Sequence, residues 1–406
     1  MSEREKKKEG KRITLGIAFT VLVLASIIAS VVFLNAQNKQ ILEKNINLNV
    51  RIANTLTLTV HRANGKVETY VKEGDPWERN FFYLIVNSFF GRYYNSPYTI
   101  YKTDGSTFTQ PDWEILYTSG SADYYPMLAI GIGSGTTSFS PYDYELSVLV
   151  QRANVTSANF VFNDNGTHLV ETASASFTAS SAVTISEVGL YWEGFVYGAA
   201  PTKYIYVLIA RDLITSISLA SGDAVTVTYT ITVPYNQAPM LKNLAALIAD
   251  YILGAKYYGK TVSFTTLSGT VASAMDIGHD YYLSSGIDNV KEYDYVYIGS
   301  GDPIYRTTLS SLYSQVATTV SYVTINLSVN STYAVINLPT VAVTVPSATV
   351  IKEVGLVIDS TDIDPSTSNN AQKVLILYFP LSNPISVPAG SGVKFTFTIT
   401  FPLGGS

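Results

Sequence analysis

ISLASGDAVTVTYTITVP at Ile217–Pro234 and ISVPAGSGVKFTFTITFP at Ile385–Pro402 are two versions of one strand-forming sequence. Nine of their eighteen positions are identical, and both alternate apolar residues with Thr, Ser, Tyr or Lys. An alternation of period two is typical of a strand with one buried face. The chain of 406 residues therefore carries the same strand twice, 168 residues apart.

Three more pairs of motifs repeat in the same order. They are Asn80–Gly91 with Asn243–Gly254, Ile132–Gly135 with Ile298–Gly301, and Glu187–Leu190 with Glu353–Leu356, at offsets of 163, 166 and 166 residues. Because order and spacing are kept, the sequence predicts an internal duplication. We expect one copy over residues 74–236 and a second over residues 237–406, each a helix followed by about seven strands.

The fold class predicted for both copies is mainly β. Short alternating runs, such as Leu56–Val60 and Thr340–Val345, recur between turn signals, and Ala63–Lys66 (ANGK) is typical of a tight hairpin. Outside the N-terminal region only Trp77–Gly91 and Met240–Gly254 have a helical pattern, and both end in Gly. We therefore expect two duplicated β-sandwich, jelly-roll-like domains with one short helix each.

The strand that leads each copy is expected to come from a different place. For copy two it is the last strand of copy one, Ala224–Val233, whereas copy one has its own leading strands, Asn49–Val60 and Val67–Lys72. The polar stretch Gln37–Asn47 joins these strands to the N-terminal region. A strand on such a tether can pair with its own sandwich or with a neighbour's exposed edge, and both arrangements are open.

The N-terminal region predicts an anchor in a lipid bilayer. Residues 1–12 form a basic tail, and Ile13–Leu34 follows without a charge inside a predicted transmembrane helix over residues 13–36. About 20 apolar residues span a bilayer, and flanking Lys and Arg keep the tail inside. The stalk and leading strands, residues 37–73, and both copies then lie on the extracellular or virion-exterior side. A cleavable secretory signal ending near Leu34–Ala36 is the alternative, and it exports the remainder equally.

Charge and composition limit the kinds of binding partner and site that the chain can have. The part after the tail has 20 basic and 28 acidic residues, so it is a poor ligand for nucleic acid. There is no cysteine, which excludes disulfides and thiolate metal sites. Four glycosylation sequons begin at Asn154, Asn165, Asn326 and Asn330.

The repeated motifs do not predict a catalytic, cofactor or metal site. The Gly-Ser-Gly elements at residues 133–135 and 299–301 lack the Lys-Ser/Thr of a phosphate-binding loop, so turns between strands are favoured. Glu187 and Glu353 could be read as a catalytic pair, but such a pair lies within about 10 Å and these belong to separate copies. We expect them to have a structural role at the start of a buried strand.

Other polar residues give weaker signals. His61, His168 and His279 have no metal-ligand or triad spacing, and the loop with Asp359, Asp362 and Asp364 lacks EF-hand spacing, which favours a solvated loop over a calcium site. Exposed rings of Trp113, Trp192 and Tyr197 could instead line a sugar groove in a glycan-binding module or hydrolase. Burial of these rings would favour a structural protein.

The motif series of copy one resembles virion and tail-fibre-like proteins of phages and archaeal viruses. Its elements are IGSGTT at Ile132–Thr137, ISEVGLY at Ile185–Tyr191, LIARD at Leu208–Asp212 and GDAVTVTYTIT at Gly222–Thr232. Copy two departs from the series, since Asp302-Pro303 replaces the threonines and Tyr378-Phe379-Pro380 replaces Ala-Arg-Asp. The resemblance implies a β-sandwich building block and no enzyme. The composition also resembles, more loosely, surface filament subunits of hyperthermophilic archaea, some of which are joined by donated strands.

The sequence therefore predicts a non-enzymatic, membrane-anchored structural or attachment protein of an archaeal virion or cell. Its expected partners are the bilayer, copies of itself, and a receptor or glycan on a host or cell surface. A secreted filament subunit and a glycan-binding module are the alternatives.

Overall fold

The structure is a computed structural model, and it describes most of the chain between residues 41 and 402. The described residues are 23–26, 41–89, 99–108, 118–119, 122–123, 127–196, 203–235, 240–255, 257–269, 271–272, 294–304, 306, 308–321, 326–330, 332–340, 342–360 and 372–402. This part of the chain is mainly β with several separate sheets, as predicted.

The described part of the first half contains two large sheets, the α-helix α2 (Arg79–Phe89) and the short 3-10 helix η1 (Ser157–Asn159). One sheet has the order β10-β11-β14-β2-β3 and the other β13-β12-β8-β9. The strands are β2 (Ala53–His61), β3 (Val67–Glu73), β8 (Met127–Gly133), β9 (Leu149–Asn154), β10 (Phe160–Asp164), β11 (His168–Thr178), β12 (Val183–Val196), β13 (Lys203–Leu219) and β14 (Ala224–Pro234). Short hairpins, β4 (Ile100–Tyr101) with β5 (Thr107–Phe108) and β6 (Thr118–Ser119) with β7 (Ala122–Asp123), lie between α2 and β8.

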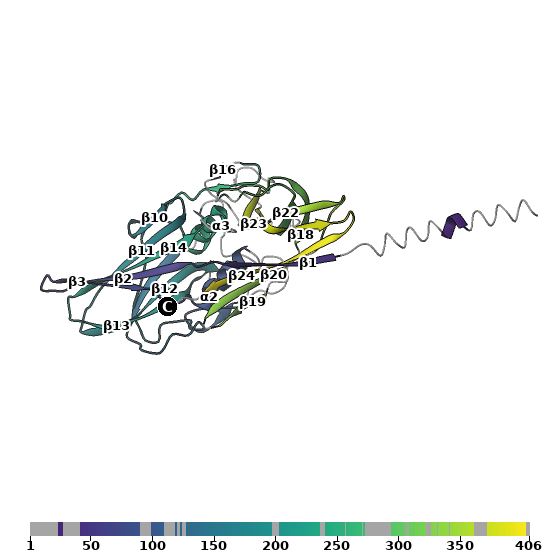
Figure 1. The fold of residues 1–406 in the computed structure, drawn as a ribbon. Coiled ribbons are helices and arrows are strands. Elements are labelled where there is room, and N and C mark those ends of the chain that lie inside the picture. The colour runs from purple at the N-terminus through teal and green to yellow at the C-terminus, as the bar shows by residue number, and fades with distance from the viewer. Residues whose placement is uncertain are drawn as a thin grey trace, which may run out of the picture.

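The second half, green to yellow in Figure 1, has two sheets with a corresponding strand order, although its edge strand β1 is parallel to β24 whereas β2 is antiparallel to β14. Its sheets have the orders β19-β20-β24-β1, with β21 also on β24, and β23-β22-β17-β18. Its elements are α3 (Lys242–Leu247), the π-helix η2 (Ile248–Ile252), β15 (Phe264–Thr265), β16 (Val271–Ala272), β17 (Asp294–Gly299), β18 (Gln315–Ser321), β19 (Asn326–Val329), β20 (Tyr333–Pro339), β21 (Val343–Thr344), β22 (Thr349–Ser360), β23 (Gln372–Val387) and β24 (Gly392–Pro402).

The two halves share irregularities as well as strand order. The register of β12 on β13 shifts after Ile185 and after Leu190, and that of β22 on β23 shifts after Ile351 and after Leu356. Bulges are specific local features, so their recurrence supports the duplication read from the sequence. The boundaries between the copies remain predictions.

A buried asparagine holds the helix in each half. Asn80 of α2 donates to the carbonyls of Tyr101 and Leu208, and its own carbonyl accepts the Tyr101 N–H. Asn243 of α3 makes the same three contacts, donating to Thr265 and Leu375 and accepting from Thr265. One side chain thus joins a helix, a short hairpin and a large sheet in both copies.

The strand β1 (Ile41–Asn49) corrects two expectations. It lies in the stretch expected to be a polar tether, and it pairs in parallel with β24 over nine residues, from Ile41 opposite Gly392 to Asn49 opposite Thr400. The expected leading strand of copy two, Ala224–Val233, instead lies inside the first half's sheet, where β14 has β11 on one edge and β2 on the other. A strand with both edges hydrogen-bonded cannot complete a second sheet, so the edge of β24 is covered by β1.

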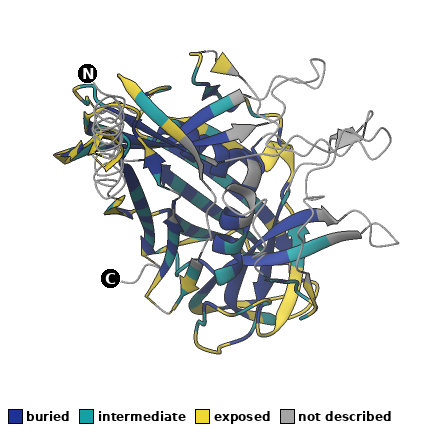
Figure 2. Ribbon diagram, turned by 90° about the vertical axis from the view of Figure 1, so that its right-hand side faces the viewer, coloured by how far each residue is buried: buried dark blue, intermediate teal, exposed yellow. Residues whose placement is uncertain are grey.

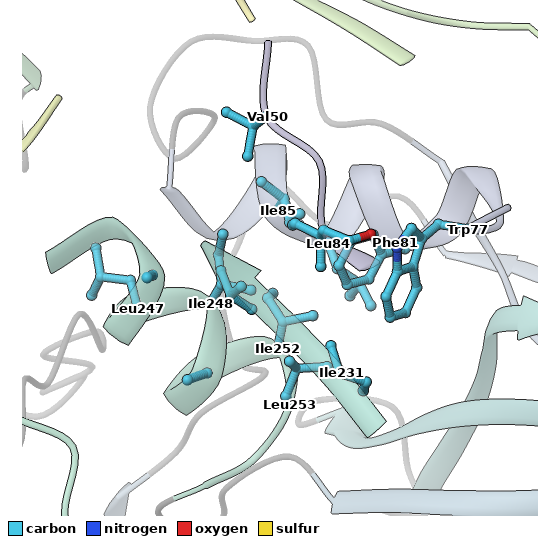
Figure 3. Close-up of a cluster of buried hydrophobic side chains, with 14 of the residues drawn as sticks. Val50, Trp77, Phe81, Leu84, Ile85, Ile231, Leu247, Ile248, Ile252 and Leu253 are labelled. Atoms are coloured by element: carbon cyan, nitrogen blue, oxygen red, sulfur yellow. Dashed lines mark hydrogen bonds between the residues drawn. The ribbon is translucent and has the colours of Figure 1, made fainter. Parts of the chain in front are cut away.

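The helices of the two halves meet in a shared apolar core. The cluster around them contains Val50, Trp77, Phe81, Leu84, Ile85, Ile231, Leu247, Ile248, Ile252 and Leu253 (Figure 3). Phe82 of α2 contacts Phe401 of β24, with ring centroids 5.3 Å apart. Figure 2 shows buried positions throughout the strands, and one core cluster contains residues of both halves.

The remaining local predictions have mixed outcomes. The expected helices at 77–91 and 240–254 are confirmed over Arg79–Phe89 and over Lys242–Ile252, residues 90–91 lie outside the described residues, and Gly254 has the positive φ, 75°, expected after a helix end. Gly65 in the predicted hairpin turn has a φ of 86°. The strand expected at 340–345 is reduced to β21.

The membrane segment Ile13–Leu34 lies outside the described residues apart from the helical residues 23–26. Among the residues that the structure describes, no helix has both the length and the apolar character needed to cross a membrane.

Candidate functional site

The repeated motifs of the first half converge on one buried carboxylate, that of Glu187. Its Oε1 accepts the N–H groups of Gly135 at 2.9 Å and Val148 at 2.8 Å, and its Oε2 accepts that of Ser147 at 3.1 Å. Glu187 is fully buried on β12. The carboxylate therefore fixes the loop between β8 and β9 to the neighbouring strand.

The glycines of the Gly-Ser-Gly element make room for this carboxylate. A Cβ on Gly133 would lie 2.7 Å from the Glu187 side chain, and one on Gly135 would lie 2.3 Å from Oε1. The element is thus a turn between strands, as expected, and its glycines are explained by close packing. Gly299 repeats this relation to Glu353, with a Cβ distance of 2.3 Å.

Arg211 of β13 completes the cluster. Its guanidinium donates to Glu187 Oε2 at 2.8 Å and to Asp143 Oδ2 at 2.7 Å. It also donates to the Thr137 carbonyl at 2.9 Å and to the Ser147 hydroxyl at 2.7 Å. Arg211 is 1% exposed, so this is a buried ion pair with most of its hydrogen-bonding capacity used.

The electrostatics follow from these contacts. Burial by itself would raise the pKa of Glu187, but hydrogen bonds from the Val148 N–H and from Arg211 outweigh it, so the pKa is lowered. Burial would likewise lower the pKa of Arg211, yet its bonds to Glu187 and Asp143 raise it. Both groups are therefore charged at neutral pH and stabilise each other.

The second half keeps the carboxylate and replaces the cation. Glu353 accepts the N–H groups of Tyr313 at 3.0 Å and Ser314 at 2.8 Å, as well as the Tyr378 hydroxyl at 2.9 Å. Gly189 pairs with Arg211, and the equivalent Gly355 pairs with Tyr378. Tyr378 therefore occupies the position of Arg211, which corrects the sequence alignment that placed Phe379 there. Burial, followed by the bond to Glu353, raises the pKa of Tyr378.

Three other buried acids distinguish the halves. Asp212 accepts the Tyr229 hydroxyl at 2.8 Å, and burial raises its pKa to about 6. Both oxygens of Glu78 and of Glu171 lack a hydrogen-bond partner within the described part of the chain. Burial raises the pKa of each well above its ordinary range, with Asp143 adding to the shift of Glu78 and Asp250 to that of Glu171. Leu241, Ile336 and Phe379 stand at the positions of Glu78, Glu171 and Asp212 in the second half.

Residues from the two halves also meet around Glu171. Tyr258, which follows η2, stacks on Phe160 of β10 at 4.2 Å between ring centroids and accepts the Leu128 N–H at 2.7 Å. Lys242 of α3 forms an ion pair with Asp164. Glu171 and Asp250 are thus two buried acids at the seam between the halves.

The structure does not bring the other candidate residues into one site. His61 ends β2 and is exposed, and His168 lies beside Asn165 at a hairpin tip. His279, Asp362 and Asp364 lie outside the described residues, whereas Asp359 pairs with Lys373 in a strand ladder. Within the described ranges no group of three His, Asp or Glu side chains could hold a metal ion.

The structure likewise does not bring together the aromatic residues proposed for a sugar groove. Trp192 is 1% exposed on β12, so its ring belongs to the core. Trp113 and Tyr197 lie outside the described residues.

The residues that hold this arrangement were partly visible in the sequence. Glu187, Glu353 and the glycines were found because they repeat, and Arg211 was found as part of a motif. Asn80 and Asn243 are the first residues of the aligned helix segments, yet the strands to which they hydrogen-bond are far away in sequence. Tyr378 was hidden because the equivalent segments differ by one residue in spacing.

The chain matches no protein-family model, no curated protein and no solved structure.

Proposed function

We propose that this chain is a non-enzymatic structural or attachment protein, held at a membrane by Ile13–Leu34 and displayed outward as two tandem β-sandwich units. We propose that it is displayed on the surface of an archaeal virion or cell, because its motif series resembles virion and tail-fibre-like proteins of phages and archaeal viruses. Copies of the same chain are its proposed partners, together with the bilayer and a receptor or glycan on the opposing surface.

The observation that carries this proposal is the path of the chain as it leaves the N-terminal segment. β1 pairs along the last strand of the second half, the Val50 N–H donates to the Thr400 carbonyl at 2.8 Å, and the chain then enters β2 of the first half (Figure 1). The segment beside the proposed anchor is thus built into the sheets of both halves. A protein that holds two units away from a membrane needs such a connection.

The parallel register of β1 and β24 suits a joint that must resist tension. Ile41 at the anchor side lies opposite the beginning of β24, and Asn49 lies opposite its end. Pulling the anchor end of β1 against the C-terminal end of β24 would shear all nine residue pairs together. The main-chain hydrogen bonds of such a ladder give strength without requiring a particular side chain.

The buried charges support a structural role over acid–base chemistry. Glu187 and Glu353, the two repeated carboxylates, each accept hydrogen bonds from neighbouring backbone N–H groups and from one side chain. Their oxygens are thereby committed to loop positioning. Burial of Trp192 in the core also favours a structural protein over a sugar groove that uses its ring.

Membrane extraction of the full chain tests the proposal. We expect the full chain to stay with membranes in alkaline carbonate and to need detergent, with residues 41–402 open to protease from outside only. A variant lacking residues 13–34 should be soluble and remain where it is made. If the full chain, with its N-terminal Met1 intact, were soluble without detergent, the proposal would be wrong.

A further inference from the structure

Two of the four sequons lie at equivalent places, the tips of two exposed hairpins. Asn165 lies between β10 and β11, beyond the last pair, Asp164 with Leu169. Asn330 lies between β19 and β20, beyond the last pair, Val329 with Ala334. These strands correspond in the two halves, so the duplication has kept a sequon at the same turn.

The two tips share two backbone hydrogen bonds to the side-chain oxygen of the asparagine. Asn165 Oδ1 accepts the N–H groups of Thr167 at 3.0 Å and His168 at 2.9 Å. Asn330 Oδ1 accepts those of Thr332 at 2.8 Å and Tyr333 at 2.9 Å. Both asparagines and both threonines are exposed.

The turn by itself does not explain the sequence of the tips. The backbone bonds that both tips share use only the side-chain oxygen, which Asp would supply equally well. At Asn165 the Thr167 hydroxyl adds a bond to Oδ1 at 2.9 Å and one to His168 Nδ1 at 2.9 Å, but the shared backbone bonds need no hydroxyl residue at that position. A sequon needs the Asn amide nitrogen and a hydroxyl residue at that third position. Both tips retain both requirements, although the residue before each Asn differs, Asp164 in one and Val329 in the other.

The other two sequons lie within strands. Asn154 ends β9, donates through Nδ2 to Glu193 Oε2 at 2.7 Å and accepts the Tyr206 hydroxyl at 3.1 Å. Asn326 is in β19 and pairs with Asn337 of β20. In the folded chain the Asn154 amide is occupied, and the Asn326 backbone is fixed in a ladder. At its exposed tip, by contrast, Asn165 lies beyond the last ladder pair, and its Nδ2 contacts the half-buried ring of His168, with Nδ1 at 3.2 Å and Nε2 at 2.5 Å.

We propose that Asn165 and Asn330 are the N-glycan acceptors of the folded chain, and that Asn154 and Asn326 are not. The amide nitrogen of each tip Asn forms a bond to C1 of a lipid-linked oligosaccharide, the bond from C1 to the lipid phosphate breaks, and the amide proton passes to a base of the transferase. The lipid phosphate leaves. The inference rests on the proposed function, because only an exported chain meets this enzyme.

The test uses the folded full chain in detergent, with a sequon appended at the C-terminus as an internal control. The chain is incubated with a purified single-subunit oligosaccharyltransferase and its lipid-linked oligosaccharide, and glycopeptides are counted by mass spectrometry. We expect glycans on Asn165, Asn330 and the appended sequon. Asn165→Gln, Thr167→Val, Asn330→Gln and Thr332→Val should each remove one glycan, whereas Asn154→Gln should remove none.

Two outcomes would overturn the inference. One is modification of the appended sequon with both tips unmodified, and the other is modification of Asn154 or Asn326 to the same extent as the tips. Asn165→Asp, which keeps the turn oxygen, should lose its glycan without a loss of stability and so separates acceptor loss from misfolding. Because this reaction needs no export in a cell, its failure is distinct from a failure of the membrane-extraction experiment.

Discussion

Replacing Arg211 by Met should destabilise the first half far more than any single surface charge change. Met keeps most of the side-chain length but leaves the fully buried Glu187 carboxylate without its cation. Removing one partner of a buried ion pair costs about 3–5 kcal/mol, because the other charge stays desolvated. With both side chains at most 1% exposed, no reduction for solvent screening applies.

Two other substitutions calibrate this expectation. Tyr378→Phe removes one hydrogen bond of 2.9 Å to Glu353 and no formal charge, which should cost about 1.5–3 kcal/mol. Arg51→Met removes an ion pair to Glu73 whose side chains are 57% and 63% exposed, and should cost about 1 kcal/mol or less. The expected order of destabilisation is therefore Arg211→Met, then Tyr378→Phe, then Arg51→Met.

The measurement is guanidinium denaturation of the full chain in detergent, followed by tryptophan fluorescence. Trp192 lies on β12, the strand that carries Glu187, so it reports unfolding of this region. Because the pKa of Glu187 is lowered, its contribution is present above the unfolded value of about 4.3 and is lost as pH falls through the folded value. The difference between wild type and Arg211→Met should therefore shrink from pH 7 to about pH 3. A loss below about 1 kcal/mol for Arg211→Met, or one equal to that of Tyr378→Phe, would refute the reasoning.

Further predictions concern the buried acids and β1. Burial raises the pKa of Asp212 from 3.8 to about 6, so its stabilising contribution below pH 3.8 is lost as the pH rises to about 6. This loss of unfolding free energy amounts to about 3 kcal/mol. Asp212→Asn should abolish it, as measured by denaturation curves at pH 4 and 7. An unfolding free energy that depends on pH as strongly as in the wild type would contradict the prediction. Glu171→Leu should raise stability at pH 7 by about 1–2 kcal/mol, since it removes a buried carboxyl that has no hydrogen-bond partner among the described residues, and a measured loss would contradict this. Leu48→Asp places a charge at a buried position of β1 and should lower the free energy of unfolding by at least about 2 kcal/mol. It should also speed hydrogen exchange in β24, and unchanged exchange would contradict the prediction. A chain without residues 1–50 should bind a peptide of residues 38–52; if it is equally stable and ignores the peptide, β1 is only a stalk.

Sequence periodicity was sufficient to predict most of the individual strands. In β14 the burial alternates strictly between buried and partly exposed positions, as the pattern of Val225–Val233 predicts. The hairpin turn and the two helices follow from equally local signals, since Asn-Gly favours positive φ and Gly ends helices. The duplication was visible for the same reason, because each copy must satisfy the same local rules.

The pairing of β1 could not be predicted in this way. Its nine residues, ILEKNINLN, contain a Lys, a Glu and three Asn, and Leu48 is the one buried position among them, so the apolar signal of the strand is weak. β24 offers it an unpaired edge that exists only after the second half has folded. The choice of β1 over β14 for that edge is therefore a property of the assembled sheets.

The cluster around Glu187 likewise depends partly on local sequence and partly on tertiary structure. The sequence by itself determined that a Glu and close-packed glycines recur in both copies, because those residue types are needed wherever the same loop must meet the same strand. Only the tertiary structure decided that Arg211 neutralises the carboxylate in one half while Tyr378 serves in the other. The reason is physical: the bulges of β12 and β22 set which side chain of the neighbouring strand reaches the buried acid, and that register is established by long-range pairing.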